Sequence, residues 1–199
     1  TEIIHTDPAS LSKGASAEAV QAMFQYAMTV IKEKRTQPGE DLASQLLHAE
    51  LDGRRLTDEE FLLFFMLLVD AGGDTTRNLV GTGTYELMHS EGAWEQLAED
   101  PAGRLPLARE ELLRLISPVI YMRRTLTQDY VLNGQAMQKG DKVVMYYGAA
   151  NRDSRMFTDP HQLDLTRQQA RHLAFGGGHH VCLGQWYARL EIDAIFTEM

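Results

Sequence analysis

The segment that runs from Thr57 to about Met88 constrains the fold more than any other part of this sequence. Thr57 is followed three residues later by Glu60, which is the pattern of a capping box and predicts that a helix begins here. Apolar side chains then continue at helical spacing, so the helix is expected to be roughly 45–48 Å long. A helix of this length and apolar character typically passes through the middle of a large domain.

The remaining sequence combines predicted helices with a later group of short strands. Ser117 and Pro118 end the last of the early helices, and β-branched and aromatic runs follow. Asn133 and Gly134 lie between two such runs and predict a tight hairpin. The expected fold class is therefore mainly α with small β-sheets. The predicted helices cover about residues 16–35, 41–50, 57–88, 93–100 and 105–115 and the segment after Gly184, and the predicted strands cover about 119–122, 130–132 and 142–147.

Composition excludes several classes of protein. The formal net charge is −9, which disfavours the wrapping of duplex nucleic acid. The longest apolar run, Phe61 to Val69, is about half of the roughly 20 residues that cross a bilayer, so no membrane span is expected. Cys182 is the single cysteine, which rules out an intrachain disulfide and a Cys-rich zinc site. Such cysteine usage is typical of a reducing compartment, so a cytoplasmic location is predicted.

The segment from Phe175 to Gly184 carries the most chemical information. Its three consecutive glycines cost backbone entropy, which a tight turn against a flat ligand would justify. Cys182 precedes a predicted helix whose N–H groups and dipole favour a thiolate, and a thiolate ligates metals. Two alternatives stay open: a buried free cysteine, and a nonhaem metal site of His179, His180 and Cys182. A dinucleotide-binding loop is excluded because Val181 stands where its third glycine belongs.

Two further segments are unusual. The middle of the long helix reads Ala71-Gly72-Gly73-Asp74-Thr75-Thr76, although each glycine costs about 1 kcal/mol relative to alanine. A buried carboxylate beside hydroxyls there suits proton transfer to a bound ligand, and a helix crossing that needs small residues is the alternative. Glu111 and Arg114 share a helix face, which taken alone indicates a surface ion pair.

Together, and in this order, the three segments resemble the cytochrome P450 family of haem-thiolate monooxygenases. Phe175-x-x-Gly178-x-x-x-Cys182-x-Gly184 is similar to the family's haem loop. Residues 71–76 are similar to its oxygen-activation motif, and Glu111-x-x-Arg114 is similar to its structural pair. The resemblance covers nearly the whole chain, since further matches occur in order at Arg124-Thr125, 150–153, 157–160 and 164–167.

The resemblance implies a haem b cofactor whose iron is ligated by the Cys182 thiolate. Phe175 would pack under the haem and shield the sulfur. The amides of Leu183 and Gly184 would donate hydrogen bonds to the sulfur and thereby tune the reduction potential of the haem iron. Gly178 belongs to the same cofactor-binding loop.

Other cofactor contacts follow from the same resemblance. Arg124 and His180 stand where the family contacts the haem propionates, and an arginine fork suits a carboxylate. Arg123 is the adjacent alternative to Arg124. Ala71 would leave room for O2 beside the haem.

The resemblance also assigns catalytic and structural roles. Asp74 and Thr75 would deliver protons to the iron-bound oxygen. A buried network would hold the fold near the haem, and breaking such a network typically costs about 3–5 kcal/mol. Its expected members are Glu111, Arg114 and Arg167.

A mostly apolar set of residues is expected to line the substrate pocket, which suits a hydrophobic substrate bound by burial. Details around 76–78 and 145–151 resemble bacterial members that oxidise steroids, terpenoids or alkyl chains. Asp70 departs from the family, which has a small or apolar residue there. It is expected to meet a polar substrate group or a part of the missing half, or else to be turned aside and hydrogen-bonded. The expected pocket residues are Leu67, Asp70, Ala71, Val119, Ile120, Tyr121 and Met122.

The protein implied is a soluble bacterial-type monooxygenase that inserts one oxygen atom from O2 into its substrate. Electrons would come from a ferredoxin and its NAD(P)H-dependent reductase, and Arg167, Arg171 and Arg189 predict a basic docking surface around Cys182. A haem-binding sensor or a truncated pseudo-enzyme without turnover is the alternative. Because family members are longer, residues 1–199 are expected to form a partial domain that lacks the N-terminal half and the extreme C-terminus.

Overall fold

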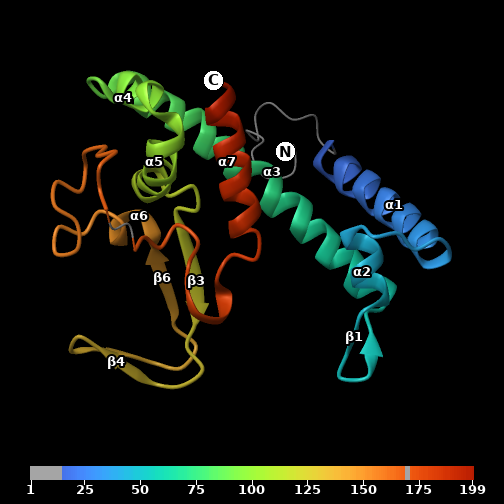
Figure 1. Ribbon diagram of the computed structural model, residues 1–199. Helices are drawn as coiled ribbons and strands as arrows, with labels where there is room; N and C mark the ends of the chain where they lie inside the picture. The colour runs from blue at the N-terminus through green and yellow to red at the C-terminus, as the bar shows by residue number, and fades with distance from the viewer. Residues whose placement is uncertain (1–14, 169–170) are drawn as a thin grey trace. The chain divides into compact units, whose positions relative to one another are not determined.

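The computed structural model describes residues 15–168 and 171–199 in two compact units, one ending at Asp74 and the other beginning at Thr75 (Figure 1). The division falls inside helix α3 (Asp58–His89), which is continuous over 32 residues. The long helix predicted from Thr57 is therefore present. The first unit also contains α1 (Ala15–Thr36), α2 (Leu42–His48) and a hairpin of β1 (Glu50–Leu51) and β2 (Arg54–Arg55).

The predicted capping box forms at the start of α3. The N–H of Glu60 donates to the Thr57 hydroxyl at 3.2 Å, and the N–H of Thr57 donates to a Glu60 carboxylate oxygen at 2.9 Å. Arg54 binds the same carboxylate with both terminal nitrogens. The hydrogen bond from Arg54, followed by that from Thr57, lowers the pKa of Glu60 to about 2. The first turn of α3 is therefore closed by two reciprocal hydrogen bonds, and the carboxylate that takes part in them is charged.

A small apolar core holds the first unit together. Ile31 of α1, Leu47 of α2 and Phe61 of α3 are buried against one another. Phe61 and Phe65 lie one helical turn apart with stacked rings. The first part of α3 is thus fixed by α1 and α2 through apolar burial.

The second unit contains the elements on which most predicted site residues lie. Its helices are α4 (Ala93–Glu99), α5 (Pro101–Ile116), α6 (Tyr147–Ala150) and α7 (Gln185–Glu198), with a 3-10 turn, η1, at Gly178–His180. Its strands are β3 (Tyr121–Thr125), β4 (Tyr130–Leu132), β5 (Gln135–Met137) and β6 (Lys142–Tyr146).

The core of the second unit lies where α7 packs on α5 and on the second part of α3 (Figure 1). Leu79, Leu112 and Ile192 are among its buried members. Gly83 allows the close approach, because a Cβ there would lie 3.3 Å from the Phe196 ring and 3.4 Å from a Leu112 methyl. Helix α7, which follows Cys182, is therefore anchored at its far end by apolar contacts.

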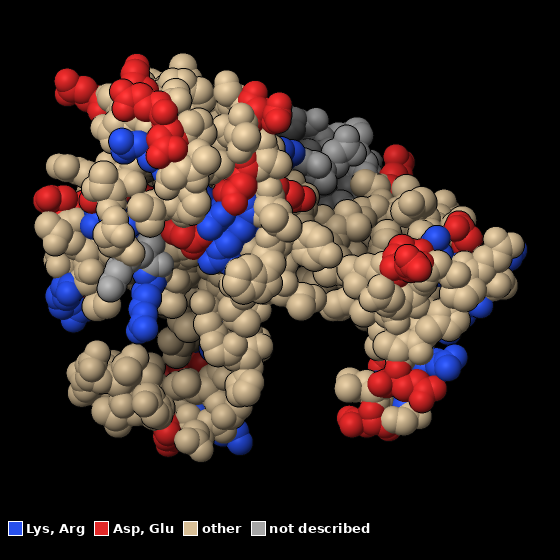
Figure 2. Space-filling model, in the orientation of Figure 1, with Lys and Arg blue, Asp and Glu red and all other residues tan. Residues whose placement is uncertain are grey.

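Two antiparallel pairs make up the sheets of this unit. β3 pairs with β6, and β4 pairs with β5. The turn of the second pair is the predicted one, since Asn133 and Gly134 have φ of +50° and +82°. Uncharged side chains cover most of this hairpin in the view of Figure 2.

Several element boundaries differ from the prediction. β3 begins at Tyr121 instead of Val119, and α5 begins at Pro101, four residues early, because the Asp100 carboxylate caps it through the Gly103 N–H. The short elements β1, β2, β5 and α6 were not predicted. Over the described ranges, no helix is long and apolar enough to span a membrane.

Candidate functional site

Two glycines in left-handed conformations shape the loop in front of Cys182. Gly176 and Gly178 have φ of +68° and +64°, a region that side chains with a Cβ rarely adopt. A Cβ on Gly176 would also lie 3.2 Å from the Tyr147 hydroxyl and 3.4 Å from the His180 carbonyl oxygen. The glycine run thus forms the tight turn expected from the sequence.

A backbone hydrogen bond closes this loop. The Cys182 N–H donates to the Phe175 carbonyl oxygen at 2.9 Å. Cys182 is exposed, so the alternative of a buried free cysteine is wrong. The N–H groups of Leu183 and Gly184, just before α7, donate no hydrogen bond to the described backbone. These amides and the helix dipole are therefore available to a thiolate.

Exposed apolar side chains lie next to Cys182 along the chain. Val181 and Leu183, on either side of the cysteine, are exposed, as are Trp186 and Tyr187 at the start of α7. Covering such side chains is favourable by about 25 cal/mol per Å² of apolar surface. An accessible thiol, free amides and apolar neighbours are together suited to haem bound through sulfur.

His179 and His180 do not complete a metal site with Cys182. In the part of the chain that the structure describes, no group of three His, Cys, Asp or Glu side chains could hold a metal ion. The nonhaem centre left open by the sequence therefore has no support in the geometry. His180 is exposed and lies in η1.

Glu111, Arg114 and Arg167 lie in one ion network. Arg114 donates from Nε and Nη2 to the two Glu111 oxygens at 2.7 and 2.8 Å, and Arg167 donates from Nε at 2.9 Å. The Arg114 and Glu111 side chains are 0% and 1% exposed. The pair is therefore not a surface ion pair, and the contacts expected among the three side chains are present.

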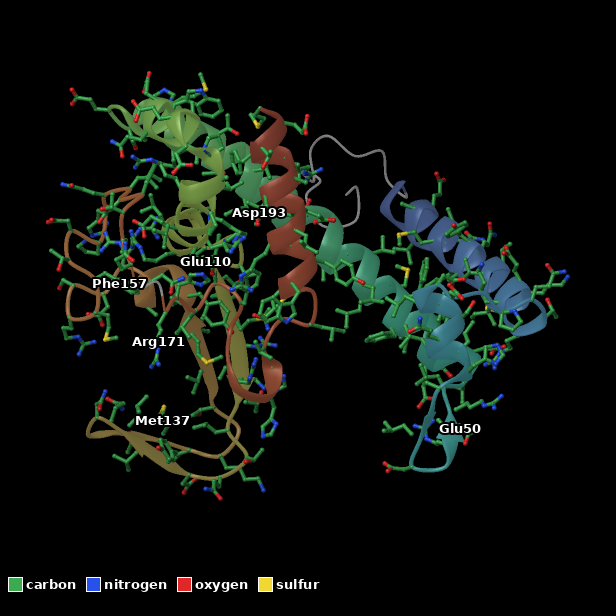
Figure 3. All side chains as sticks on the ribbon, viewed as in Figure 1. Glu50, Glu110, Met137, Phe157, Arg171 and Asp193 are labelled. Carbon is green, nitrogen blue, oxygen red and sulfur yellow. The ribbon has the colours of Figure 1, made fainter. Side chains whose placement is uncertain are left out.

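Arg114 also binds the backbone of a distant loop. Its Nη1 donates to the carbonyl oxygens of Asn151 and Pro160, both at 2.8 Å, and its Nη2 donates to that of Gln162 at 3.2 Å. With the two carboxylate bonds, all five N–H donors of the guanidinium are satisfied. Phe157 lies against it, with the ring centroid 5.1 Å from Cζ, and its position is labelled in Figure 3.

Asn151 is a structural residue that the sequence interpretation missed. It is buried, its Nδ2 donates to the Ser117 hydroxyl at 2.8 Å, and its Oδ1 accepts from the Leu173 N–H at 2.6 Å. Leu173 is two residues before Phe175. Asn151 therefore connects Arg114 to the cysteine loop, which runs from Phe175 to Cys182. The only sign of its importance in the sequence was the match of residues 150–153 to the family, because the residues that it binds are distant along the chain.

The unusual centre of α3 is partly exposed. Asp74 and Thr75 are consecutive and partly buried, so the carboxylate is less enclosed than expected, and Ala71 is exposed. A Cβ on Gly72 or Gly73 would meet no atom within 4 Å among the described residues. Among the described residues, no other element therefore packs against these two glycines as the alternative of a helix crossing would require.

Comparisons with known proteins decide the family. The family model described as Cytochrome P450 matches residues 104–199, which include the ion network and Cys182. A methyl-branched lipid omega-hydroxylase from Mycobacterium tuberculosis is 46% identical over 175 residues, which is 87% of this chain and 41% of that protein. The chain belongs to the cytochrome P450 family. A steroid C26-monooxygenase from the same species is 37% identical over 98% of this chain and 43% of its own length.

Solved P450 structures share the fold. CYP109E1 from Bacillus megaterium in complex with testosterone is 39% identical, with a TM-score of 0.87, and the match covers 92% of this chain and 50% of that chain. The expectation of a mainly helical P450 fold with small sheets, incomplete in this chain, is confirmed. This chain spans half or less of the length of the relatives and the structure named here.

In this P450 the two candidate propionate arginines differ in environment. Arg124 is partly buried on β3 and donates from Nη1 to the Arg123 carbonyl oxygen at 3.0 Å, whereas the Arg123 side chain is exposed. Neighbouring side chains on a strand point to opposite faces, so only one of the two can face a given ligand. Contact of Arg124 or His180 with a haem propionate stays a prediction.

The expected pocket residues of the P450 lie on two elements. Leu67, Asp70 and Ala71 belong to α3 and are exposed. The other members lie just before or on β3, where all but the partly buried Val119 are exposed. Their apolar surfaces are accessible, as binding of an apolar substrate requires, and their role as pocket walls stays a prediction. These members are Val119, Ile120, Tyr121 and Met122.

The expected basic docking surface is wrong for two of its three arginines. Arg167 and Arg189 are only 11% and 19% exposed because they pair with Glu111 and Glu110. Arg171 is exposed, and Figure 3 labels it. In Figure 2, basic and acidic side chains lie together beside α7. Much of the positive charge near Cys182 in sequence is therefore compensated within the chain.

Proposed function

We propose that the protein is a haem-thiolate monooxygenase that inserts one oxygen atom from O2 into a hydrophobic substrate. The observation that carries this proposal is the exposed Cys182, set between a left-handed glycine turn and the free amides before α7. Those are the conditions under which a cysteine serves as a metal-bound thiolate. The monooxygenase and hydroxylase names of the relatives support the same reaction class.

Cys182 would hold haem b through its sulfur, with Phe175 packed beside it. A haem with a thiolate ligand supplies the cleavage of the O–O bond. The amides of Leu183 and Gly184 would donate to the thiolate and moderate its basicity. The proposal also pairs Arg124 with a haem propionate.

Asp74 and Thr75 would supply protons during the reaction. Partial exposure gives the Asp74 carboxylate access to solvent protons, and the adjacent hydroxyl of Thr75 is a donor and acceptor that can pass them on. Ala71 and the two glycines that follow are small residues, as expected where O2 has to reach the haem. These residues thus perform general acid catalysis in the proposal.

The proposed substrate is an elongated apolar molecule of the lipid or steroid class. The relatives are named for methyl-branched lipids and for C26 of steroids, and CYP109E1 was solved with testosterone. The exposed apolar side chains of α3 and β3 are compatible with such a ligand. Electrons would come from a ferredoxin and its NAD(P)H-dependent reductase.

Turnover with isotopically labelled O2 tests this function. The purified holoprotein, a ferredoxin, its reductase and NADPH are incubated with a steroid or a branched fatty acid. We expect the mass of the product to show one labelled oxygen atom. Unlabelled product, or haem reduction without any product across both substrate classes, would contradict a monooxygenase and favour a sensor.

A further inference from the structure

Glu110, the neighbour of Glu111 on α5, gathers three basic side chains around one carboxylate. Arg189 donates to it from Nε and Nη2 at 2.8 and 2.9 Å, Arg109 donates from Nε at 2.8 Å, and His172 Nε2 lies 3.1 Å away. Burial raises the pKa of Glu110, but the hydrogen bonds from these three partners outweigh it and hold that pKa well below its usual range. Glu110 is therefore a charged hub between α5, α7 and the segment before the cysteine loop.

The orientation of His172 is fixed by its two ring nitrogens. The Ala174 N–H donates to Nδ1 at 3.2 Å, so the ring proton that reaches Glu110 is the one on Nε2. The side chain is only 3% exposed. A continuous hydrogen-bonded path therefore runs from the backbone next to Phe175 to the Glu110 carboxylate.

Two of the partners of Glu110, Arg189 and His172, also contact the ring of Phe175. The Arg189 guanidinium lies over the Phe175 ring, 4.6 Å from its centroid. The His172 ring is tilted against the same ring, with 5.9 Å between centroids. Because the Phe175 carbonyl oxygen accepts the Cys182 N–H, a displacement of Phe175 would move the cysteine.

We propose that Glu110 is a positioning residue for the Cys182 thiolate, acting through Arg189 and His172 on Phe175. The inference rests on the proposed function, in which Cys182 ligates haem. A planar guanidinium held by two parallel hydrogen bonds keeps a fixed orientation, which lets Arg189 set the position of an aromatic ring. Glu110 therefore does more than join α5 to α7.

The chain offers a matched control that separates positioning of Phe175 from simply joining α5 to α7. Arg109 of α5 also pairs with Asp193 of α7, a partly buried carboxylate that is labelled with Glu110 in Figure 3. The Asp193→Asn variant removes a charge between the same two helices without touching Phe175. Glu110→Gln removes the charge of the hub at nearly constant volume, and Arg189→Lys keeps the charge but loses the planar group over the ring.

The readout is the carbon monoxide spectrum of each reduced holoprotein, which separates thiolate-ligated from thiolate-displaced haem. We expect the ratio of displaced to ligated haem to rise about tenfold in Glu110→Gln and in Arg189→Lys. Removing a residue that supports a metal ligand typically weakens metal binding by at least this factor. Asp193→Asn is expected to keep the wild-type ratio. The midpoint of thermal unfolding is measured for all variants.

Equal spectra for the wild type and all three variants, whatever their unfolding midpoints, would overturn the positioning role. If Glu110→Gln does not fold, the comparison of Arg189→Lys with Asp193→Asn decides. A wild-type protein without a thiolate band would instead overturn the proposed function itself, and the two failures are thereby distinguished.

Discussion

Replacing Arg114 with alanine is expected to lower the free energy of unfolding by about 3–5 kcal/mol, the typical cost of breaking a buried ion pair. The substitution leaves the Glu111 carboxylate, 1% exposed, without its two closest donors. It also removes the donor from the carbonyl oxygens of Asn151, Pro160 and Gln162. Denaturant unfolding of the holoprotein, followed by circular dichroism, measures the loss.

Arg155→Ala is the matched control. Arg155 also pairs with a neighbouring carboxylate, Asp153, but its side chain is 87% exposed. Exposed pairs of this kind contribute little, so no measurable change in stability is expected. Unfolding of the Arg114 and Arg155 variants at the same denaturant concentration would contradict the structural role of the network.

Replacing Asp74 with asparagine is expected to lower product formation by about 10²–10⁴-fold, the contribution of a positioned general acid. The amide keeps the shape of the side chain but cannot release and regain a proton at neutral pH. Reductant consumption is expected to continue, so that the ratio of product to NADPH falls. That ratio is measured by chromatography and by NADPH absorbance in the same reaction.

Glu59→Gln removes an exposed acid from the first turn of the same helix and is expected to leave the ratio unchanged. Thr75→Ala is expected to lower the ratio as Asp74→Asn does, and Thr75→Ser to restore it. An Asp74→Asn enzyme with the wild-type ratio of product to NADPH would show that the proton takes another route.

Features set by neighbouring residues could be predicted from the sequence. The capping box of Thr57 and Glu60 and the hairpin turn at Asn133 and Gly134 form as predicted. The glycine turn before Cys182 does so as well. In each case the residues that determine the conformation lie within a few positions of one another, so their types alone define it.

Features set by distant partners could not be predicted in this way. The prediction of a basic docking surface was wrong for Arg189 and Arg167. They pair with Glu110 and Glu111, which lie 79 and 56 residues away along the chain. Asn151 was missed for the same reason. Because of these pairings across the fold, two arginines whose sequence context suggested exposure are mostly buried.

The carbon monoxide difference spectrum of the reduced holoprotein tests the assignment of Cys182 most directly. The wild type is expected to show the red-shifted band of a thiolate-ligated haem, and Cys182→Ala is expected to lack it. Absence of that band from the folded, haem-loaded wild type, or an unaltered band in Cys182→Ala, would contradict thiolate ligation by this residue.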